Sequence, residues 1–175
     1  DSNYIVITGS AGKTSVKDLT GFCLDKLDKT FYSKNSFNNK YGVPLSIINS
    51  PQSTKFSVLE VGMDKKGEID TLTKLIRPNL GLITNISYAH IKNFKNVDEI
   101  AKAKGEIINN ISPSGVMIIN KDDKYCNYFI SKAKMRNLNI ITFSKKNKLA
   151  DVVYLGERKN KNKFLSKFLI KGKIK

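Results

Sequence analysis

Short apolar runs and amphipathic segments alternate along the chain. Within the amphipathic segments, apolar residues recur three and four positions apart, which is typical of one face of a helix. An alternation of strands and helices predicts a largely parallel sheet with crossover helices, so the predicted fold class is α/β. The predicted strands are 4–8, 31–32, 56–61, 80–86, 116–119 and 140–143. The predicted helices are a segment carrying Val16, Leu19, Cys23 and Leu27, a segment after Pro44, and segments over 69–76, 97–111 and 125–134.

Two of these segments also predict how they pack. The first helix places Val16, Leu19, Cys23 and Leu27 on one side, so we expect Cys23 to be a small buried side chain. The strand 80–86 is almost continuously apolar, as a strand is when its sheet is covered on both faces. The sheet is therefore predicted to be flanked by helices.

The pattern changes after Ser144. Residues 151–156 and 164–170 are predicted to be two strands of a β-hairpin around 157–163, in a strongly basic segment. The whole chain of 175 residues is long enough to bury a core of its own. We therefore expect a single domain over 1–175, with a mostly parallel sheet and a C-terminal segment like a β-hairpin.

Composition narrows the class of protein. No apolar run is long enough to cross a bilayer, so we expect no membrane insertion. The first residues lead straight into a strand and do not resemble a signal peptide. Cys23 and Cys126 lack metal-ligand spacing and fit a reducing compartment. The expected location is cytoplasmic, and the expected oligomeric state is a monomer.

The net charge of +16 raises the question of a nucleic-acid partner. Of the 31 basic residues 28 are lysines, whereas proteins that read a base sequence depend on arginine for bidentate contacts. Residues 145–175 carry 11 basic and two acidic side chains, so much of the excess charge lies in that segment. We favour a solvated lysine surface and expect no nucleic-acid partner. A basic nucleic-acid-binding module stays the alternative.

A glycine-flanked loop follows the first strand. Residues 8–15 read Thr-Gly-Ser-Ala-Gly-Lys-Thr-Ser and precede a helical pattern. A strand, a tight turn and a helix N-terminus form a phosphate cradle, because backbone N–H groups and the helix dipole favour an anion. Lys13 is placed to reach the β- and γ-phosphates of ATP, and the Thr14 hydroxyl to ligate Mg²⁺. The predicted nucleotide contacts in this P-loop are Gly9, Ser10, Ala11, Gly12, Lys13, Thr14 and Ser15.

The spacing of this loop is shorter than that of the common P-loop. The longer form would need a glycine at position 7, where Ile7 stands. The form G-x-x-G-K-T therefore separates the chain from ordinary P-loop ATPases. The alternative is a chance Gly-Lys-Thr in a turn that caps a helix.

Polar residues also stand at the ends of later strands, where open α/β sheets bind ligands. Glu60 closes the strand 56–61, and its carboxylate suits Mg²⁺ held together with Thr14; a capped or paired carboxylate is the alternative. Asn85 closes the next strand and is a candidate nucleotide contact. His90, the single histidine, follows it as either a ligand or a structural side chain.

Taken together, these stretches resemble the Mur ligases. The matching segments run in the family's order over roughly residues 5–145. They are the loop 8–15, Asn-Ser-Phe-Asn-Asn-Lys-Tyr-Gly-Val-Pro-Leu (35–45), Leu-Glu-Val-Gly-Met (59–63), Gly-Glu-Ile (67–69), Arg-Pro (77–78), Thr-Asn-Ile-Ser-Tyr-Ala-His-Ile (84–91), Ala-Lys-Ala-Lys-Gly-Glu-Ile (101–107) and Asn-Lys-Asp-Asp (120–123).

The resemblance implies a two-metal site. Thr14 and Glu60 would bind one Mg²⁺, and His90 and Lys104 would bind a second. Lys104 matches a lysine that is carbamylated in such ligases, which converts a repelling cation into an anionic oxygen ligand. Lys13, Glu60, His90 and Lys104 would then be the catalytic set. By its residues alone, Lys104 is a solvated helix lysine among many others.

The resemblance also implies contacts for three asparagines and a reaction. Asn120 would contact adenine, and Asn38 and Asn39 would lie near the phosphates or the substrate. The similarity is strongest to members that use ATP and Mg²⁺ to add D-Ala-D-Ala to UDP-MurNAc-tripeptide, through an acyl phosphate, in peptidoglycan precursor synthesis. Another Mur ligase, or a ligase like the folylpolyglutamate synthases, is the alternative.

The matching segments correspond to the family's central ATP-binding domain, in truncated form. The N-terminal domain that binds the UDP-sugar and the C-terminal domain that closes over the nucleotide have no counterpart in these 175 residues. We therefore expect little or no ligase activity from this chain alone.

Overall fold

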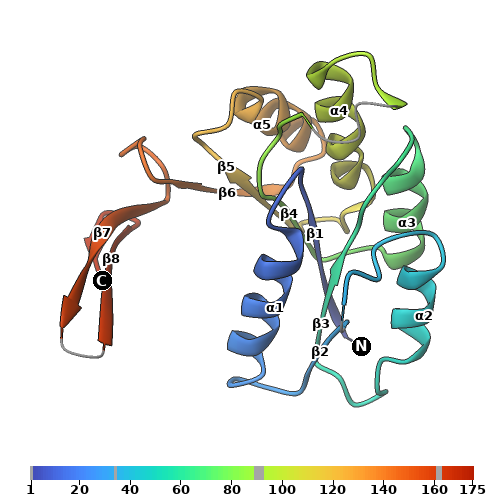
Figure 1. Ribbon diagram of the computed structural model, residues 1–175, viewed down its shortest axis with the longest axis horizontal. Helices are drawn as coiled ribbons and strands as arrows, with labels where there is room; N and C mark the ends of the chain where they lie inside the picture. The colour runs from blue at the N-terminus through green and yellow to red at the C-terminus, as the bar shows by residue number, and fades with distance from the viewer. Residues whose placement is uncertain (1, 34, 89–92, 161–162) are drawn as a thin grey trace.

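One nine-stranded sheet organises the chain (Figure 1). The computed structural model describes residues 2–33, 35–88, 93–160 and 163–175. Strands and helices alternate as the sequence predicts, which confirms the α/β class. The strands are β1 (Asn3–Thr8), β2 (Thr30–Tyr32), β3 (Phe56–Glu60), β4 (Leu80–Ile83), β5 (Val116–Asn120), β6 (Asn139–Ser144), β7 (Val152–Asn160), β8 (Lys163–Ile170) and β9 (Lys173–Ile174). The helices are α1 (Lys13–Leu24), α2 (Gly42–Ile48), α3 (Glu68–Ile76), α4 (Val97–Lys104), the 3-10 helix η2 (Gly105–Asn110) and α5 (Cys126–Met135).

The strand order puts the loop after β1 at a switch point of the sheet. Strands β1 to β7 are parallel and lie in the order β2-β3-β1-β4-β5-β6-β7. In the register, Val6 of β1 lies between Leu59 of β3 and Gly81 of β4. The chain thus builds outward from β1 in both directions. The carboxyl ends of β1, β3 and β4 meet where sheets of this kind bind ligands.

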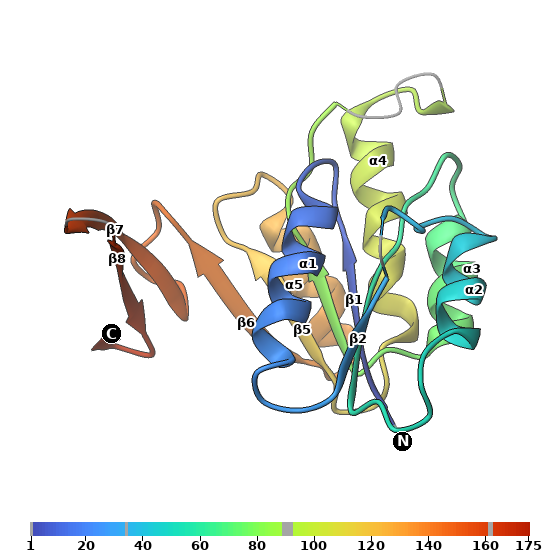
Figure 2. The same cartoon turned by 60° about the horizontal axis from the view of Figure 1, so that its bottom comes forward.

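The helices cover the two faces of the sheet unequally (Figures 1 and 2). On one face α1 packs against β1, β2 and β3. On the other face η2 packs between α3 and α5. The main hydrophobic core lies under this second layer and includes Val6, Leu59, Ile83, Met117 and Ile119.

The predicted apolar side of α1 is not the side that contacts the sheet. Leu19 is 64% exposed and Leu27 is 77% exposed, and Leu27 lies beyond the end of the helix. Cys23 is exposed as well, so the prediction that it is buried is wrong. The helical spacing of these residues is real, but it does not decide which way the helix faces.

The buried positions of α1 are Lys17 and Gly21. A Cβ at Gly21 would lie 2.3 Å from the ring of Tyr32, so the absence of a side chain lets the helix lie close to β2. The first turn of α1 is fixed by the loop that precedes it. The direction in which the helix faces therefore follows from the loop and from this close approach.

The sheet is also covered less completely than its apolar strands predict. In β4, Gly81 and Ile83 are buried, whereas Leu80 and Leu82 are partly exposed. These two leucines lie on the face of the sheet on which α1 packs. The same alternation runs through β5, and β4 ends at Ile83, three residues before the predicted end. Within the described residues the helices cover β4 and β5 fully on one face only.

This one-sided cover predicts different costs for two neighbouring truncations. We expect Ile83→Ala to lower the free energy of unfolding by about 2–4 kcal/mol, because it leaves a cavity in the core. Leu82→Ala should cost only about 1–2 kcal/mol, because the Leu82 side chain already touches water. Urea unfolding of both variants measures the difference, and equal losses would contradict the one-sided cover.

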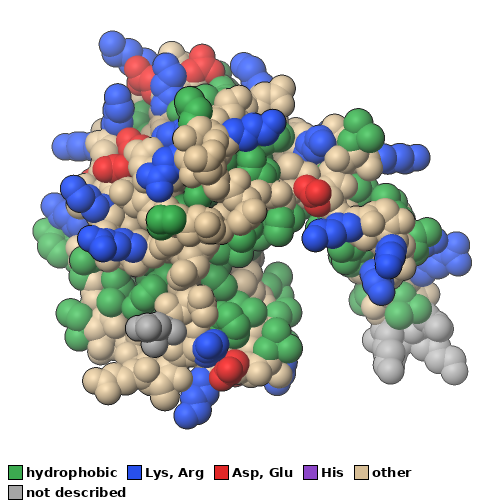
Figure 3. All heavy atoms as spheres, turned by 180° about the vertical axis from the view of Figure 1, so that it is seen from behind, with side chains coloured by type: hydrophobic (Ala, Val, Ile, Leu, Met, Phe, Trp, Pro, Cys, Tyr) green, Lys and Arg blue, Asp and Glu red, His purple; other side chains and the backbone are tan. Residues whose placement is uncertain are grey.

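The predicted C-terminal hairpin is confirmed, but its strands are longer than predicted. β7 and β8 are antiparallel and pair as far as Asn160 and Lys163, so residues 157–160 belong to β7 and not to the turn. The rings of Tyr154 and Phe168 face each other across the hairpin, with their centroids 5.6 Å apart. The hairpin projects away from the helices, and basic side chains are spread over both it and the body of the molecule (Figures 1 and 3).

The predicted helix over 97–111 consists of two pieces. The α-helix α4 ends at Lys104, and the chain continues as the 3-10 helix η2. Gly105 stands at the junction, where a Cβ would lie only 3.2 Å from the ring of Phe129. None of the helices in the described ranges has the length and the apolar character that crossing a bilayer requires.

Candidate functional site

Two glycines shape the loop between β1 and α1. Gly9 has a φ of 151°, and a Cβ there would lie 1.8 Å from Thr84 Oγ1. Gly12 has a φ of 78°, in the left-handed region that favours glycine, and it is the N-cap residue of α1. The loop therefore has the predicted form, a tight turn from a strand into a helix N-terminus.

The chain that follows β4 supports this loop. Thr84 Oγ1 donates to the carbonyl of Ala11 at 2.7 Å. The carbonyl of Asn85 accepts from the N–H of Ser10 at 2.9 Å, and Asn85 Oδ1 accepts from the N–H of Ala11 at 3.1 Å. Ser10 Oγ in turn accepts from the N–H of Ser87 at 2.9 Å. Asn85 thus holds the loop in shape from its β4 side.

A polar hollow of about 340 Å³ opens over the loop. It joins the loop to the end of β3 and to the segment after β2. Lys13 contributes an ammonium group, whose Nζ donates to the carbonyl of Gly9 at 3.0 Å. The residues that line the polar hollow are Ser10, Ala11, Gly12, Lys13, Thr14, Ser15, Ser36, Asn38 and Glu60.

Glu60 brings a buried carboxylate to this hollow. The residue is 1% exposed, and its Oε1 accepts from Asn38 Nδ2 at 2.6 Å. Among the described residues none donates to Oε2. A buried carboxylate oxygen without a partner is costly, and a cation that binds it offsets the cost. The hydroxyl of Thr14 lines the same hollow and lies 3.0 Å from Ser36 Oγ.

Lys104 is fully buried at the end of α4, so its interpretation as a solvated lysine is wrong. No described residue accepts a hydrogen bond from its Nζ. Burial, and in second place the positive charge of Lys13, lower the pKa of Lys104 from 10.5 to about 7. Lys13 and Lys104 therefore lie close enough for their charges to interact.

Two of the predicted asparagines, Asn39 and Asn120, lie outside the polar hollow. Asn39 Oδ1 accepts from two backbone N–H groups at the start of α2, so its side chain orders that turn. Asn120, at the end of β5, donates to the carbonyl of Thr84 at 3.0 Å and accepts from the N–H of Asp122 at 3.0 Å. Neither lines the polar hollow. His90 lies outside the described residues.

Sequence reasoning does not single out Ser36 and Thr84. Ser36 stands inside the stretch 35–45 that resembles the family, two positions before Asn38. Thr84 directly follows β4, the strand next to β1. Their positions beside predicted residues are the only signal, because a serine or threonine in a loop has no distinctive pattern.

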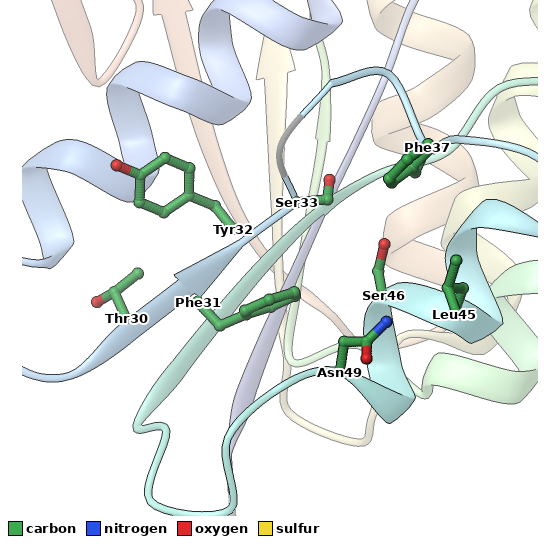
Figure 4. A pocket seen from close by; sticks show the side chains of 8 residues that line it. All are labelled: Thr30, Phe31, Tyr32, Ser33, Phe37, Leu45, Ser46 and Asn49. Carbon is green, nitrogen blue, oxygen red and sulfur yellow. The ribbon is translucent and has the colours of Figure 1, made fainter.

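A second hollow, of about 420 Å³, lies between β2 and α2 at the edge of the sheet (Figure 4). Aromatic, aliphatic and hydroxyl side chains line it, and none of the predicted nucleotide contacts does. None of the described side chains that line it carries a charge that would bind a phosphate. The polar hollow is therefore the candidate site. The residues that line the second hollow are Thr30, Phe31, Tyr32, Ser33, Phe37, Leu45, Ser46 and Asn49.

Comparison with curated proteins finds relatives named UDP-N-acetylmuramoyl-tripeptide–D-alanyl-D-alanine ligase. The UDP-N-acetylmuramoyl-tripeptide–D-alanyl-D-alanine ligase of Buchnera aphidicola subsp. Baizongia pistaciae is 38% identical over 148 residues, which are 84% of this chain and 32% of that protein. The ligase of the same name from Bacillus subtilis is 40% identical over 122 residues, which are 70% of this chain and 27% of that protein. The chain thus spans about a third of the length of the curated relatives it matches.

Comparison with solved structures finds MurF ligases with a similar fold. A crystal structure of MurF from Acinetobacter baumannii has a TM-score of 0.89 and 29% identity, over 99% of this chain and 37% of that one. MurF ligase from Thermotoga maritima in complex with ADP has a TM-score of 0.84 and 24% identity, over 99% of this chain and 39% of that one. The profile of the Mur ligase middle domain matches residues 7–174. The chain therefore belongs to the Mur ligase middle-domain family.

Proposed function

We propose that this chain is the ATP-binding domain of a ligase that adds D-Ala-D-Ala to UDP-MurNAc-tripeptide, with ATP and Mg²⁺ as cofactors. The observation that carries the proposal is the buried, unpartnered Oε2 of Glu60, among the described residues, at the hollow that Lys13 and Thr14 also line. The names of the relatives support the choice of substrates.

The residues of the hollow have complementary tasks. Lys13 and the backbone N–H groups of the loop bind the phosphates of ATP. Thr14 and Glu60 would hold Mg²⁺, which would neutralise negative charge on the phosphates. Bound Mg-ATP supplies the phosphoryl group, and the protein contributes positioning and charge neutralisation.

The reaction has two steps. The terminal carboxylate of the tripeptide attacks the γ-phosphorus, and ADP leaves with the electrons of the broken P–O bond. The amine of D-Ala-D-Ala then attacks the acyl phosphate, loses a proton and releases phosphate. A hollow of about 660 Å³ shares Asn38 with the polar hollow. Three lysines (Lys40, Lys65 and Lys66) and two carboxylates (Asp64 and Glu68) line it, and this small excess of positive charge favours the approach of an anionic substrate.

Lys104 and His90 would serve a second Mg²⁺. The neutral amine of Lys104 attacks the carbon of CO₂ and loses a proton, which leaves an anionic carbamate. A pKa of about 7 makes much of this amine neutral at neutral pH, whereas an ordinary lysine is almost fully protonated. The carbamate would also place a negative charge beside Lys13, where an ammonium is unfavourable.

In Mur ligases and folylpolyglutamate synthases alike, we expect the substrate to be selected by domains that flank the ATP-binding domain. We propose that residues 1–175 are part of a central domain, and that flanking domains bind the UDP-sugar and close over the nucleotide. Asn120 would contact adenine from the end of β5, and Asn85 would hold the loop against the phosphates.

Calorimetric titration of this chain with Mg-ATP tests the proposal. We expect saturable binding with one site and competition by Mg-ADP. The absence of any heat of binding, or equal binding of a nucleoside without phosphates, would contradict it. The full-length ligase, assayed for phosphate release with and without D-Ala-D-Ala, tests the substrates.

Glu60→Gln should separate metal binding from folding. We expect Mg²⁺ to raise the affinity for ADP at least tenfold in the unchanged chain and at most about twofold in the variant, because the variant lacks an anionic ligand. Without nucleotide, the variant should be more stable by about 1–3 kcal/mol, because a buried unpartnered charge is removed. Calorimetry with and without Mg²⁺ and urea unfolding measure the two effects. Glu157→Gln, an exposed change on the hairpin, is the control.

A further inference from the structure

Lys104 is not the one buried lysine among the described residues, because Lys17, one helical turn after Lys13, is buried as well. Lys17 is 0% exposed, although an ammonium group is among the most costly groups to remove from water. Its Nζ donates to the backbone carbonyls of Ser33 and Asn35, the latter at 2.9 Å. Among the described residues, the carboxylate in contact with it is that of Asp18, whose Oδ1 lies 3.1 Å away and whose side chain is 53% exposed. The main partners of this cation are therefore carbonyls of the segment that follows β2.

That segment carries two side chains of the polar hollow. Ser36 Oγ lies 3.0 Å from Thr14 Oγ1, and Asn38 Nδ2 donates to Glu60 Oε1 at 2.6 Å. Backbone bonds continue the connection, since the carbonyl of Asn38 accepts from the N–H of Gly62 at 2.7 Å. Both residues proposed to hold Mg²⁺ are thus in contact with residues 35–39.

The segment needs an internal support. Asn35 has a φ of 64°, a left-handed conformation that a residue with a side chain adopts at a cost. On its outer side, Ser33 and Phe37 border the 420 Å³ hollow beside α2 (Figure 4). On its inner side the segment meets α1, whose close approach to β2 brings Lys17 beneath the carbonyls.

We propose that Lys17 is a positioning residue of the nucleotide site. It fixes Ser33 and residues 35–39 so that Ser36 and Asn38 contact Thr14 and Glu60, and it does not itself touch the nucleotide. The inference rests on the proposed function for its consequence, a lower affinity for Mg-nucleotide. Its geometric part, the ordering of the segment, is independent of any nucleotide.

Hydrogen exchange without nucleotide tests the geometric part. Lys17→Met keeps the length of the side chain and removes its donors. We expect exchange of the Asn38 and Gly62 N–H groups to accelerate at least about tenfold, while the N–H groups of Val116 and Asn139, between β4, β5 and β6, change little. Uniform acceleration over both sets, or none at Asn38 and Gly62, overturns the proposal.

A double-mutant cycle on Mg-ADP affinity tests the consequence. We expect Lys17→Met to weaken binding about tenfold in the unchanged chain but less than about threefold in an Asn38→Ala background, because Lys17 acts through the segment that carries Asn38. Additive losses would mean that Lys17 only stabilises the fold, and they overturn the positioning role. Asp18→Asn is the matched control, and it should leave both exchange and affinity near those of the unchanged chain.

A replacement variant and a readout without nucleotide separate a failure of folding, or of the proposed function, from a failure of the positioning role. If Lys17→Met fails to unfold cooperatively in urea, Lys17→Gln replaces it, since a neutral amide is far less costly to bury than a charge. If the unchanged chain does not bind Mg-ADP, the proposed function fails. The exchange experiment then still decides whether Lys17 orders the segment.

Discussion

Lys13→Ala is expected to lower the affinity of this chain for Mg-ATP about tenfold to a hundredfold. The ammonium lines the polar hollow above the loop, and a hydrogen bond to a charged phosphate contributes about 1.5–3 kcal/mol. Its present partner, the carbonyl of Gly9, is a local one that phosphate oxygens can replace. Calorimetric titration of both chains under the same salt concentration measures the change.

The control for this variant is Lys26→Ala. Lys26 lies beyond α1 with its ammonium over the ring of Phe22, 5.0 Å from the centroid, and it does not line the hollow. Lys26→Ala removes the same charge as Lys13→Ala, so any general effect of net charge on nucleotide affinity appears in both variants. Equal affinity of the Lys13 variant and the unchanged chain would refute the phosphate cradle.

Lys104→Met is expected to stabilise the chain by several kcal/mol at pH 6 and by much less at pH 10. The folded chain releases the proton of Lys104 near pH 7, whereas the unfolded chain releases it near pH 10.5. Between these values the unfolded chain binds more protons, so stability rises with pH. Below pH 7 the buried ammonium costs up to about 5 kcal/mol, at 1.36 kcal/mol per pH unit, and methionine removes that cost.

Urea unfolding at a series of pH values measures this difference. Lys102→Met is the matched control, because Lys102 is an exposed lysine on the same helix. A constant stability difference between the Lys104 variant and the unchanged chain across pH 6–10 would contradict the burial of an unpartnered ammonium. With ¹³C-bicarbonate at pH 8, a carbamate resonance that Lys104→Met lacks would support carbamylation.

The fold could be predicted from the sequence because each element has a local signal. Apolar runs became strands, and the proline after Arg77 marked the end of α3 correctly, since proline cannot continue a helix. The side of α1 that packs could not be predicted. Leu19 and Leu27 have the right spacing, yet a glycine at position 21 and the ring of Tyr32 decide which side lies on the sheet. Such a close approach joins distant residues and leaves no periodic pattern.

For the candidate site, too, some residues could be predicted from the sequence and others could not. The loop 8–15 by itself predicted a phosphate cradle, because its glycines, its lysine and its place between a strand and a helix are all local properties. Glu60 was predictable as well, since a glutamate inside an apolar strand needs a partner.

Only the tertiary structure showed that two of the lysines are buried. In the sequence, Lys17 and Lys104 are two of 28 lysines, and apart from the family resemblance at Lys104 no local pattern separates them from solvated ones. In the structure both are fully buried. Lys17 binds carbonyls of a segment about 16 residues away, and Lys104 lies near a lysine 91 positions earlier in the chain. Burial and charge neighbours are set by how the sheet brings strand ends together, and a local pattern does not contain that information.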